Sequence, residues 1–280
     1  MKTDITWPKA PTSWLIDRTM YISIPFTWNL KAVHGRLSTK DFTFDRVIVG
    51  GPATKLMPDF FNALPHVERR EHYAGAMQIV NPQATKTTTG CIRSCVFCAV
   101  PKNEGKLIEL GEWPDLPVVC DNNLLASSVG HFDRVIDRLK VHGWADFNQG
   151  IDSRLLTDYH AKRLREIRRP MIRLALDSMA YADQWEVAFD RRRSAGFPKS
   201  LIRSFALIAF EENAGHTVDE AWNRCGWVEN HGVKVLPMWY HRLDAMQENI
   251  VTKGQAALGW NDDERTNIMG WFYQRRGVKR

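Results

Sequence analysis

The chain has 280 residues, of which 44% are hydrophobic and 25% are charged, and its net charge at pH 7 is +6. That composition fits a globular protein with a sizeable core, and the lack of any apolar run of about eighteen residues excludes a membrane-spanning helix. Five cysteines, three of them clustered, exclude a disulfide framework. With no apolar signal core at the N-terminus, we expect a cytoplasmic protein that binds no membrane.

The first 84 residues predict a small α/β appendage. Strands are expected over residues 20–27 and 46–49, and Gly50-Gly51-Pro52 precedes a helix expected over 58–63. This segment is too short for a complete doubly wound domain.

From residue 85 onward, strand patterns alternate with helix patterns. Strands are expected over residues 87–90, 117–121, 144–148, 171–176, 204–210 and 233–239. Helices are expected over 131–142, from an N-cap at Thr157 to 168, over 180–194, and from a Thr217–Glu220 capping box to 229.

This alternation predicts a parallel sheet with helices outside it. A full eight-unit barrel needs about 250 residues, whereas about six units fit into residues 85–245. The fold class expected is therefore α/β, with a partial (β/α)6 barrel over 85–245, the small α/β appendage before it, and a C-terminal extension over 246–280.

Three cysteines form the most informative motif of the chain. Cys91, Cys95 and Cys98 are spaced Cys-x-x-x-Cys-x-x-Cys. Cysteine thiolates are the usual ligands of iron–sulfur clusters, so these three can hold three irons of a [4Fe–4S] cluster and leave the fourth iron open. Two alternatives stay open, a zinc site completed by a distant histidine and a four-cysteine ferredoxin site using Cys120 or Cys225. Zinc sites usually contain a second pair of ligands, and the sequence has no second cysteine pair.

Polar residues follow three of the expected strands. In α/β barrels functional side chains lie at the carboxyl ends of strands, so these residues are candidates for cofactor binding, against the alternative of ordinary polar turns. Arg154 could pair with a carboxylate through its planar guanidinium. The candidates are Asp121, Asn122, Asn123, Asn148, Gln149, Asp152, Arg154, Asp177 and Ser178.

The cysteine motif, with Gly90 before it and the aromatic Phe97 before its last cysteine, resembles that of the radical S-adenosylmethionine (SAM) enzymes. The resemblance implies a [4Fe–4S] cluster at Cys91, Cys95 and Cys98, and SAM bound at its open iron. It also implies reductive cleavage of SAM to a 5′-deoxyadenosyl radical, and an electron donor such as flavodoxin or ferredoxin. In that family the end of the second strand, here Asp121 to Asn123, binds the SAM amino group. The loop from Asn148 to Arg154 would meet the ribose, the carboxylate or the substrate.

Two strings resemble the B12-type and methylthiotransferase-like branches of that superfamily. They are Gly-Cys-x-x-x-Cys-x-Phe-Cys-x-Val-Pro around the cysteines, and Val-Ile-Val-Gly-Gly-Pro-Ala-Thr at residues 47–54. The resemblance implies that residues 1–84 are a reduced cobalamin-domain-like appendage. Because the Asp-x-His-x-x-Gly motif is missing, we expect a lid or platform without bound cobalamin, the alternative being a working B12 site.

The function expected is that of a radical SAM enzyme, an oxidoreductase or transferase, acting on an unidentified substrate. One alternative is a methyl- or methylthio-transferring modifier of RNA or another macromolecule, and a second is a non-catalytic iron–sulfur electron-transfer protein. Basic residues concentrate between Arg154 and Arg203, which suggests a nucleic-acid partner or, alternatively, solvated outer helix faces. The residues concerned are Lys162, Arg163, Arg165, Arg168, Arg169, Arg191, Arg192 and Arg193.

Overall fold

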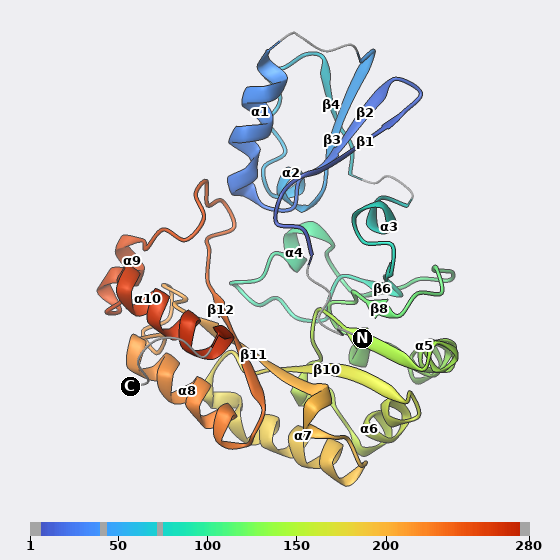
Figure 1. Cartoon of the computed structure of the whole chain (residues 1–280), viewed down its shortest axis with the longest axis vertical. Helices are drawn as coiled ribbons and strands as arrows, with labels where there is room; N and C mark the ends of the chain where they lie inside the picture. The colour runs from blue at the N-terminus through green and yellow to red at the C-terminus, as the bar shows by residue number, and fades with distance from the viewer. Residues whose placement is uncertain (1–6, 40–43, 72–74, 275–280) are drawn as a thin grey trace. The chain divides into compact units, whose positions relative to one another are not determined.

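A computed structural model describes residues 7–39, 44–71 and 75–274. The chain forms two compact units, each built from several segments (Figure 1). The first unit comprises residues 1–84, 94–105 and 241–248, and the second comprises 85–93, 106–240 and 249–280. Each unit has its own cluster of buried apolar side chains.

The first unit is built on a four-stranded mixed sheet with the strand order β1-β2-β3-β4. Strands β1 and β2 are antiparallel, whereas β2, β3 and β4 are parallel. The strands are β1 (Thr12–Ile16), β2 (Thr19–Ser23), β3 (Arg46–Gly50) and β4 (Val67–Arg69). The helical segments are η1 (Thr27–Asn29), α1 (Leu30–Ser38), α2 (Pro52–Leu56), α3 (Ala76–Val80) and α4 (Val100–Asn103).

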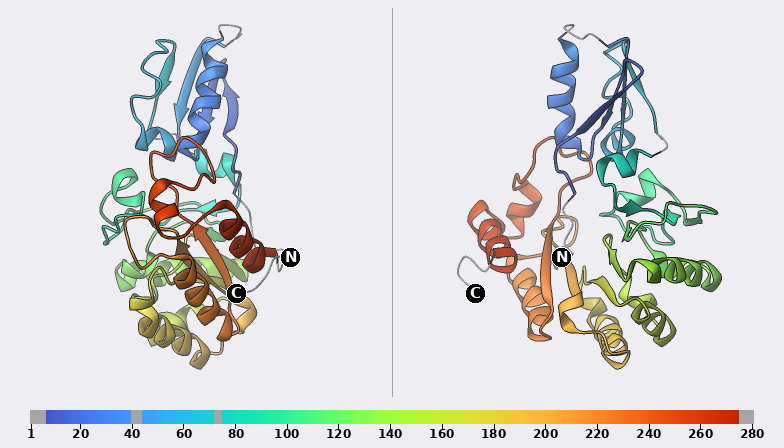
Figure 2. Two further views of the ribbon diagram at one scale, coloured as in Figure 1. Left: turned by 90° about the vertical axis from the view of Figure 1, so that its left-hand side faces the viewer. Right: turned by 45° about the vertical axis from the view of Figure 1, so that its right-hand side comes forward.

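Helix α1 lies along the sheet of the first unit, as Figure 2 shows. Its apolar residues Leu30, Val33 and Leu37 are buried and pack in one cluster with Val47 and Val49 of β3. Alternate residues of β3 therefore face the helix, as the period of two along a strand requires.

The structure confirms the strand expected at residues 46–49 and corrects two other expectations in this unit. The strand expected over 20–27 ends at Ser23, because the chain then enters η1. The helix expected over 58–63 is wrong, since those residues form turns. The helix is α2 instead, which has Pro52 at its start, where the fixed φ of proline is favourable.

The second unit is built on a six-stranded sheet whose strands follow one another in chain order, β5-β8-β9-β10-β11-β12. Every neighbouring pair from β8 to β12 is parallel. The strands are β5 (Ala84–Thr85), β8 (Val118–Val119), β9 (Trp144–Phe147), β10 (Arg169–Ala175), β11 (Ile202–Ile208) and β12 (Lys234–Trp239).

Four helices connect consecutive strands of this sheet and lie along one side of it (Figures 1 and 2). They are α5 (Val129–His142), α6 (Asp158–Arg165), α7 (Ala182–Ser194) and α8 (Val218–Asn230). Short helical turns lie in the connections, namely η2 (Leu124–Ala126), η3 (Ser153–Leu155), η4 (Met179–Tyr181) and η5 (Lys199–Leu201). The structure thus confirms the α/β class, with parallel strands and intervening helices.

After β12 the chain adds α9 (Lys253–Ala257), α10 (Asp262–Met269) and η6 (Gly270–Gln274) to the second unit. Trp260, Ile268 and Phe272 from this stretch are buried in the core of that unit. The Trp260 ring meets Trp239 of β12 edge-on at 5.1 Å between centroids. These residues therefore close the core next to the last strand.

The first strand of the sheet lies earlier than the sequence predicted. Residues 84–85 form β5, whereas Thr88–Thr89 (β6) turn away and pair with Ile108–Glu109 (β7) in a separate antiparallel ribbon. The strand expected over 87–90 is therefore part of the ribbon that leads into the cysteine segment.

Both predicted N-caps are confirmed. The hydroxyl of Thr157 accepts from the backbone N–H of His160, and the His160 side chain completes the capping box. The hydroxyl of Thr217 accepts from the N–H of Glu220. The box predicted there is not closed, because the Glu220 carboxylate lies against Arg224 at 3.0 Å. Helix α6 ends at Arg165 and not at 168.

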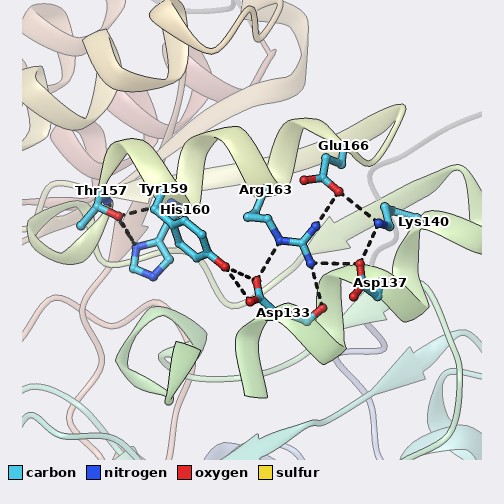
Figure 3. A network of polar contacts seen from close by, with 8 residues as sticks. All are labelled: Asp133, Asp137, Lys140, Thr157, Tyr159, His160, Arg163 and Glu166. Carbon is cyan, nitrogen blue, oxygen red and sulfur yellow. Dashed lines mark hydrogen bonds and ion pairs between the residues drawn. The ribbon is translucent and has the colours of Figure 1, made fainter. Parts of the chain in front are cut away.

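A network of charged side chains ties α6 to α5 (Figure 3). The guanidinium of Arg163 donates to Asp133 at 2.8 Å and Asp137 at 2.9 Å, and it also pairs with Glu166. Lys140 bridges Asp137 and Glu166 at 2.7 and 3.0 Å. Arg163 is thus neutralised within the protein.

Other arginines of the basic segment also contact this protein itself. Arg191 donates to the carbonyl of Leu156, Arg192 is buried over the Phe189 ring, and Arg193 pairs with Asp190. A nucleic-acid partner stays a prediction, with fewer of these arginines available than the sequence suggested. Within residues 7–39, 44–71 and 75–274, no helix has the length and apolar character needed to cross a membrane.

Candidate functional site

The cysteine segment follows β6 and offers backbone donors to two of its sulfurs. The N–H of Arg93 donates to Cys91 Sγ at 3.4 Å, and the N–H of Val100 donates to Cys98 Sγ at 3.5 Å. All three cysteine side chains are half-buried and free of disulfides. Hydrogen bonds of this kind stabilise the negatively charged thiolate, which is the form of cysteine that binds iron.

Cys91 belongs to the second unit, and Cys95 and Cys98 belong to the first. Among the described residues, no three His, Cys, Asp or Glu side chains are gathered in a metal-binding arrangement. Metal sites are commonly assembled by the metal, because binding and local ordering are coupled. Cysteine sulfur is the usual protein ligand of iron–sulfur clusters, so the chemistry of the three side chains fits a [4Fe–4S] group.

Asn123, which follows β8, connects the cysteine segment to the next strand end. Its Nδ2 lies 3.6 Å from Cys91 Sγ and 3.4 Å from Asp152 Oδ2. The side chain is 3% exposed, and its Oδ1 has no partner among the residues that the structure describes. Asn123 Oδ1 is thus a buried acceptor near Cys91, and a ligand with N–H donors could satisfy it.

Asp152, which follows β9, lies between two arginines. Its carboxylate accepts from Arg93 Nε at 2.6 Å and from Arg154 Nε at 2.7 Å. Burial raises the pKa of Asp152, but the hydrogen bonds from Arg154 and Arg93 outweigh it, so the pKa lies below its usual range. The Arg154 guanidinium also lies over the Tyr181 ring at 4.8 Å. The carboxylate that Arg154 pairs with is therefore that of Asp152.

Asp121 has a different role, because its carboxylate fixes the strand that leads to the cysteines. Oδ1 accepts from the N–H groups of Thr87 and Thr88 at 2.6 and 3.0 Å, and Oδ2 accepts from the Thr87 hydroxyl. Burial raises the pKa of Asp121, against the lowering effect of these bonds. The Thr87 hydroxyl lies 3.2 Å from Nε2 of the buried His131. These contacts tie β6 to the end of β8.

The remaining candidates are placed less closely around Cys91. Asn122 and Phe97 are half-buried, and Phe97 lies in the first unit. Gln149 is exposed, and its amide lies 3.5 Å from the half-buried Asn148. Asp177, after β10, accepts from the N–H of Leu207 at 3.2 Å, and burial raises its pKa. Ser178 caps η4.

The structure thus brings Cys91, Asn123, Asp152 and Arg154 together, and it adds Arg93, which the sequence analysis did not single out. Arg93 is one of the residues between the cysteines of the motif, and the motif does not specify which residue stands there. Its charge was therefore the only signal in the sequence that could have singled it out. In the sequence its partner Asp152 lies 59 residues away, and no local pattern predicts such a contact.

The other two cysteines have the properties of packed thiols. Cys120 is 4% exposed and Cys225 is fully buried. Burial raises the pKa of each thiol to about 12. Both therefore stay protonated at neutral pH, which disfavours them as metal ligands because thiolates bind metals.

The glycine pair of the first unit is explained by backbone packing. A Cβ on Gly50 would lie 2.8 Å from the carbonyl oxygen of Arg70, and one on Gly51 would lie 2.7 Å from Ile24 N and O. Gly51 also has a φ of 94°. Close contact between neighbouring strand ends therefore requires both glycines, whether or not a ligand binds there.

No protein-family model matches the chain, and no curated protein matches it. The geometry defines a site at the carboxyl ends of β8 and β9, in which an acidic and an amide side chain connect a cysteine motif to the sheet. A functional assignment therefore depends on the chemistry of these residues.

Proposed function

We propose that the protein is a radical SAM enzyme. The observation that carries the proposal is the contact of Cys91 with Asn123, because it joins the three-cysteine motif to the polar residues at the strand ends. In an α/β sheet of this kind, ligands bind at the carboxyl ends of parallel strands. We further propose that the six-stranded sheet is the partial (β/α)6 barrel of that superfamily. The chain-order arrangement of its strands supports this.

Each residue of the site has a proposed task. Cys91, Cys95 and Cys98 would hold the [4Fe–4S] cluster and leave one iron open for SAM. Asn123 Oδ1, buried and available to accept, would receive an N–H of the SAM amino group. Asp152 holds Asn123 and Arg93 in place, and Asp121 holds the strand that leads to Cys91.

The chemistry that such a cluster supplies is one-electron reduction of SAM, with an external donor such as flavodoxin or ferredoxin providing the electron. The bound cluster and SAM would thereby supply a 5′-deoxyadenosyl radical, with methionine released, for abstraction of a hydrogen atom from the substrate. The protein's part is to hold, orient and shield these groups.

Anaerobic reconstitution with iron and sulfide, followed by reduction with dithionite in the presence of SAM, tests the proposal. We expect about four irons per chain and formation of 5′-deoxyadenosine, measured by mass spectrometry. Alanine at Cys91, Cys95 or Cys98 should abolish both.

The matched controls are Cys120→Ala and Cys225→Ala, which should keep the cluster. Loss of iron in either control would favour a four-cysteine electron carrier. A wild-type cluster that never cleaves SAM would contradict the enzymatic assignment and favour a non-catalytic iron–sulfur protein.

A further inference from the structure

We propose that Asn123 raises the reduction potential of the cluster through an N–H···S hydrogen bond to Cys91, and that Asp152 is the positioning residue that aims this bond. The inference rests on the proposed function, because it requires a cluster at the three cysteines. It gives a polar residue at a strand end an effect on the reduction potential of the cluster, in addition to any contact with SAM.

The amide of Asn123 has one orientation that its surroundings allow. An amide nitrogen carries two N–H donors, and Nδ2 has two acceptors, Cys91 Sγ at 3.6 Å and Asp152 Oδ2 at 3.4 Å. The reverse orientation would place the amide oxygen against a carboxylate and a sulfur, both of which are acceptors. Asp152 thereby fixes which end of the amide faces Cys91.

Asp152 can act in this way without imposing its own negative charge on the sulfur. Arg93 and Arg154 donate to the carboxylate at 2.6 and 2.7 Å. The paired carboxylate is 8% exposed in its side chain, so water competes little for these bonds. Asn123 thus presents an N–H dipole to Cys91 Sγ, while the Asp152 carboxylate is paired with two guanidinium groups.

A donor to a ligand sulfur favours the reduced cluster, because reduction adds negative charge that the sulfurs share. Removing the donor should therefore make the potential more negative. The backbone N–H of Arg93 also donates to Cys91 Sγ at 3.4 Å, and no side-chain substitution removes it. An Asn123 variant therefore loses the side-chain donor to Cys91 Sγ and keeps the backbone donor.

The test is a redox titration of the reconstituted protein without SAM, followed by electron paramagnetic resonance of the reduced cluster. Two variants remove the donor, Asn123→Leu, which is similar in shape, and Asn123→Ala. At the wild-type midpoint we expect the ratio of reduced to oxidised cluster to fall about tenfold, which for one electron is about 59 mV. Thr157→Ala, which removes a helix cap elsewhere in the unit, should keep the wild-type midpoint.

Equal midpoints in wild type and both Asn123 variants would overturn the inference and leave the proposed function intact. An equal shift in Thr157→Ala would also overturn it. If neither Asn123 variant retains a cluster, wild type with ¹⁵N in the asparagine side-chain amides decides. Pulsed resonance should then detect a nitrogen coupled to the cluster, and its absence refutes the inference. A wild-type protein without a cluster refutes the proposed function itself.

Discussion

His216 is a residue whose burial sets its charge state. Its side chain is 3% exposed, and the ring meets Phe210 edge-on at 5.8 Å between centroids. Burial, and secondly the nearby Arg224 guanidinium, lower the pKa of His216 to about 4. The unfolded chain, by contrast, binds a proton at this residue near pH 6.5.

This difference predicts a dependence of stability on pH. Between pH 6.5 and about 4 the unfolded state binds more protons at His216 than the folded state, so the free energy of unfolding falls as the pH falls. The loss from this one residue should reach about 3 kcal/mol. In urea titrations at several pH values, His216→Gln should show a shallower fall over this window.

Between pH 7 and 8 His216 is neutral in both states, so the two proteins should there show the same dependence on pH. Parallel curves below pH 6.5 would contradict a lowered pKa of the buried ring.

At the residue scale, the sequence predicted part of the site. Cysteine spacing and the rule of strand ends pointed to Cys91, Asn123 and Asp152, which the structure places in contact. The role of Asp121 was not predictable, because its partners Thr87 and Thr88 lie more than thirty residues away. Asp121, Asn123 and Asp152 are all polar residues that follow a strand. Only their tertiary contacts distinguish a carboxylate that anchors a strand from a side chain that could bind a ligand.

At the element scale, helix α6 illustrates how far local signals reach. Its start was predictable, because a threonine N-cap satisfies a free backbone N–H through its own hydroxyl. Its end was not, since Glu166, which looks like helix interior in the sequence, is the C-cap and pairs with Lys140 of α5.

The cap on α6 predicts a measurable contribution to stability. Thr157→Ala should lower the free energy of unfolding by about 1 kcal/mol, because the N–H of His160 then loses its acceptor. Thr157→Ser keeps the hydroxyl and should lie within a few tenths of wild type. Urea denaturation measures both, and equal losses in the two variants would exclude the cap as the cause.

Prediction of whole elements succeeded where apolar periodicity was strong and failed where it was short. Helix α5 has five buried residues on one face, and the sequence predicted it nearly to the residue. Helix α1 went unpredicted, because its buried positions are only Leu30, Val33 and Leu37 and a glycine interrupts them. Two-residue strands such as β5 carry no periodicity, which explains the misplaced first strand.

At the scale of the whole molecule, each unit has its own core, and the two cores share no buried residue among those described. A defect confined to one core should therefore act mainly on that unit. Gly51 offers such a defect, because its positive φ and its contact with Ile24 both exclude a side chain.

Gly51→Ala should destabilise the first unit strongly, with faster hydrogen exchange in β2 and β3 and little change in β10 and β11. The reason is a clash with backbone atoms in addition to the cost of placing alanine at φ 94° and ψ 175°, a region essentially restricted to glycine, about 1–3 kcal/mol. Gly75→Ala is the matched control, since Gly75 has a φ of 82° but no atom within 4 Å of an added Cβ. Equal exchange in both variants would contradict a decisive role for the clash at position 51.

The division of the first unit among distant segments of the sequence has a consequence for its folding during translation. Residues 241–248 belong to that unit, where the Thr27 hydroxyl donates to the carbonyl of Ala245 at 2.6 Å and the Trp28 ring meets His241 at 4.7 Å. Domains ordinarily fold in the order in which they are translated. The four strands of its sheet lie within residues 12–69 and are translated early, whereas its last segment follows β12, the last strand that the structure describes. The contacts of Thr27 and Trp28 with that segment can therefore form only late in synthesis.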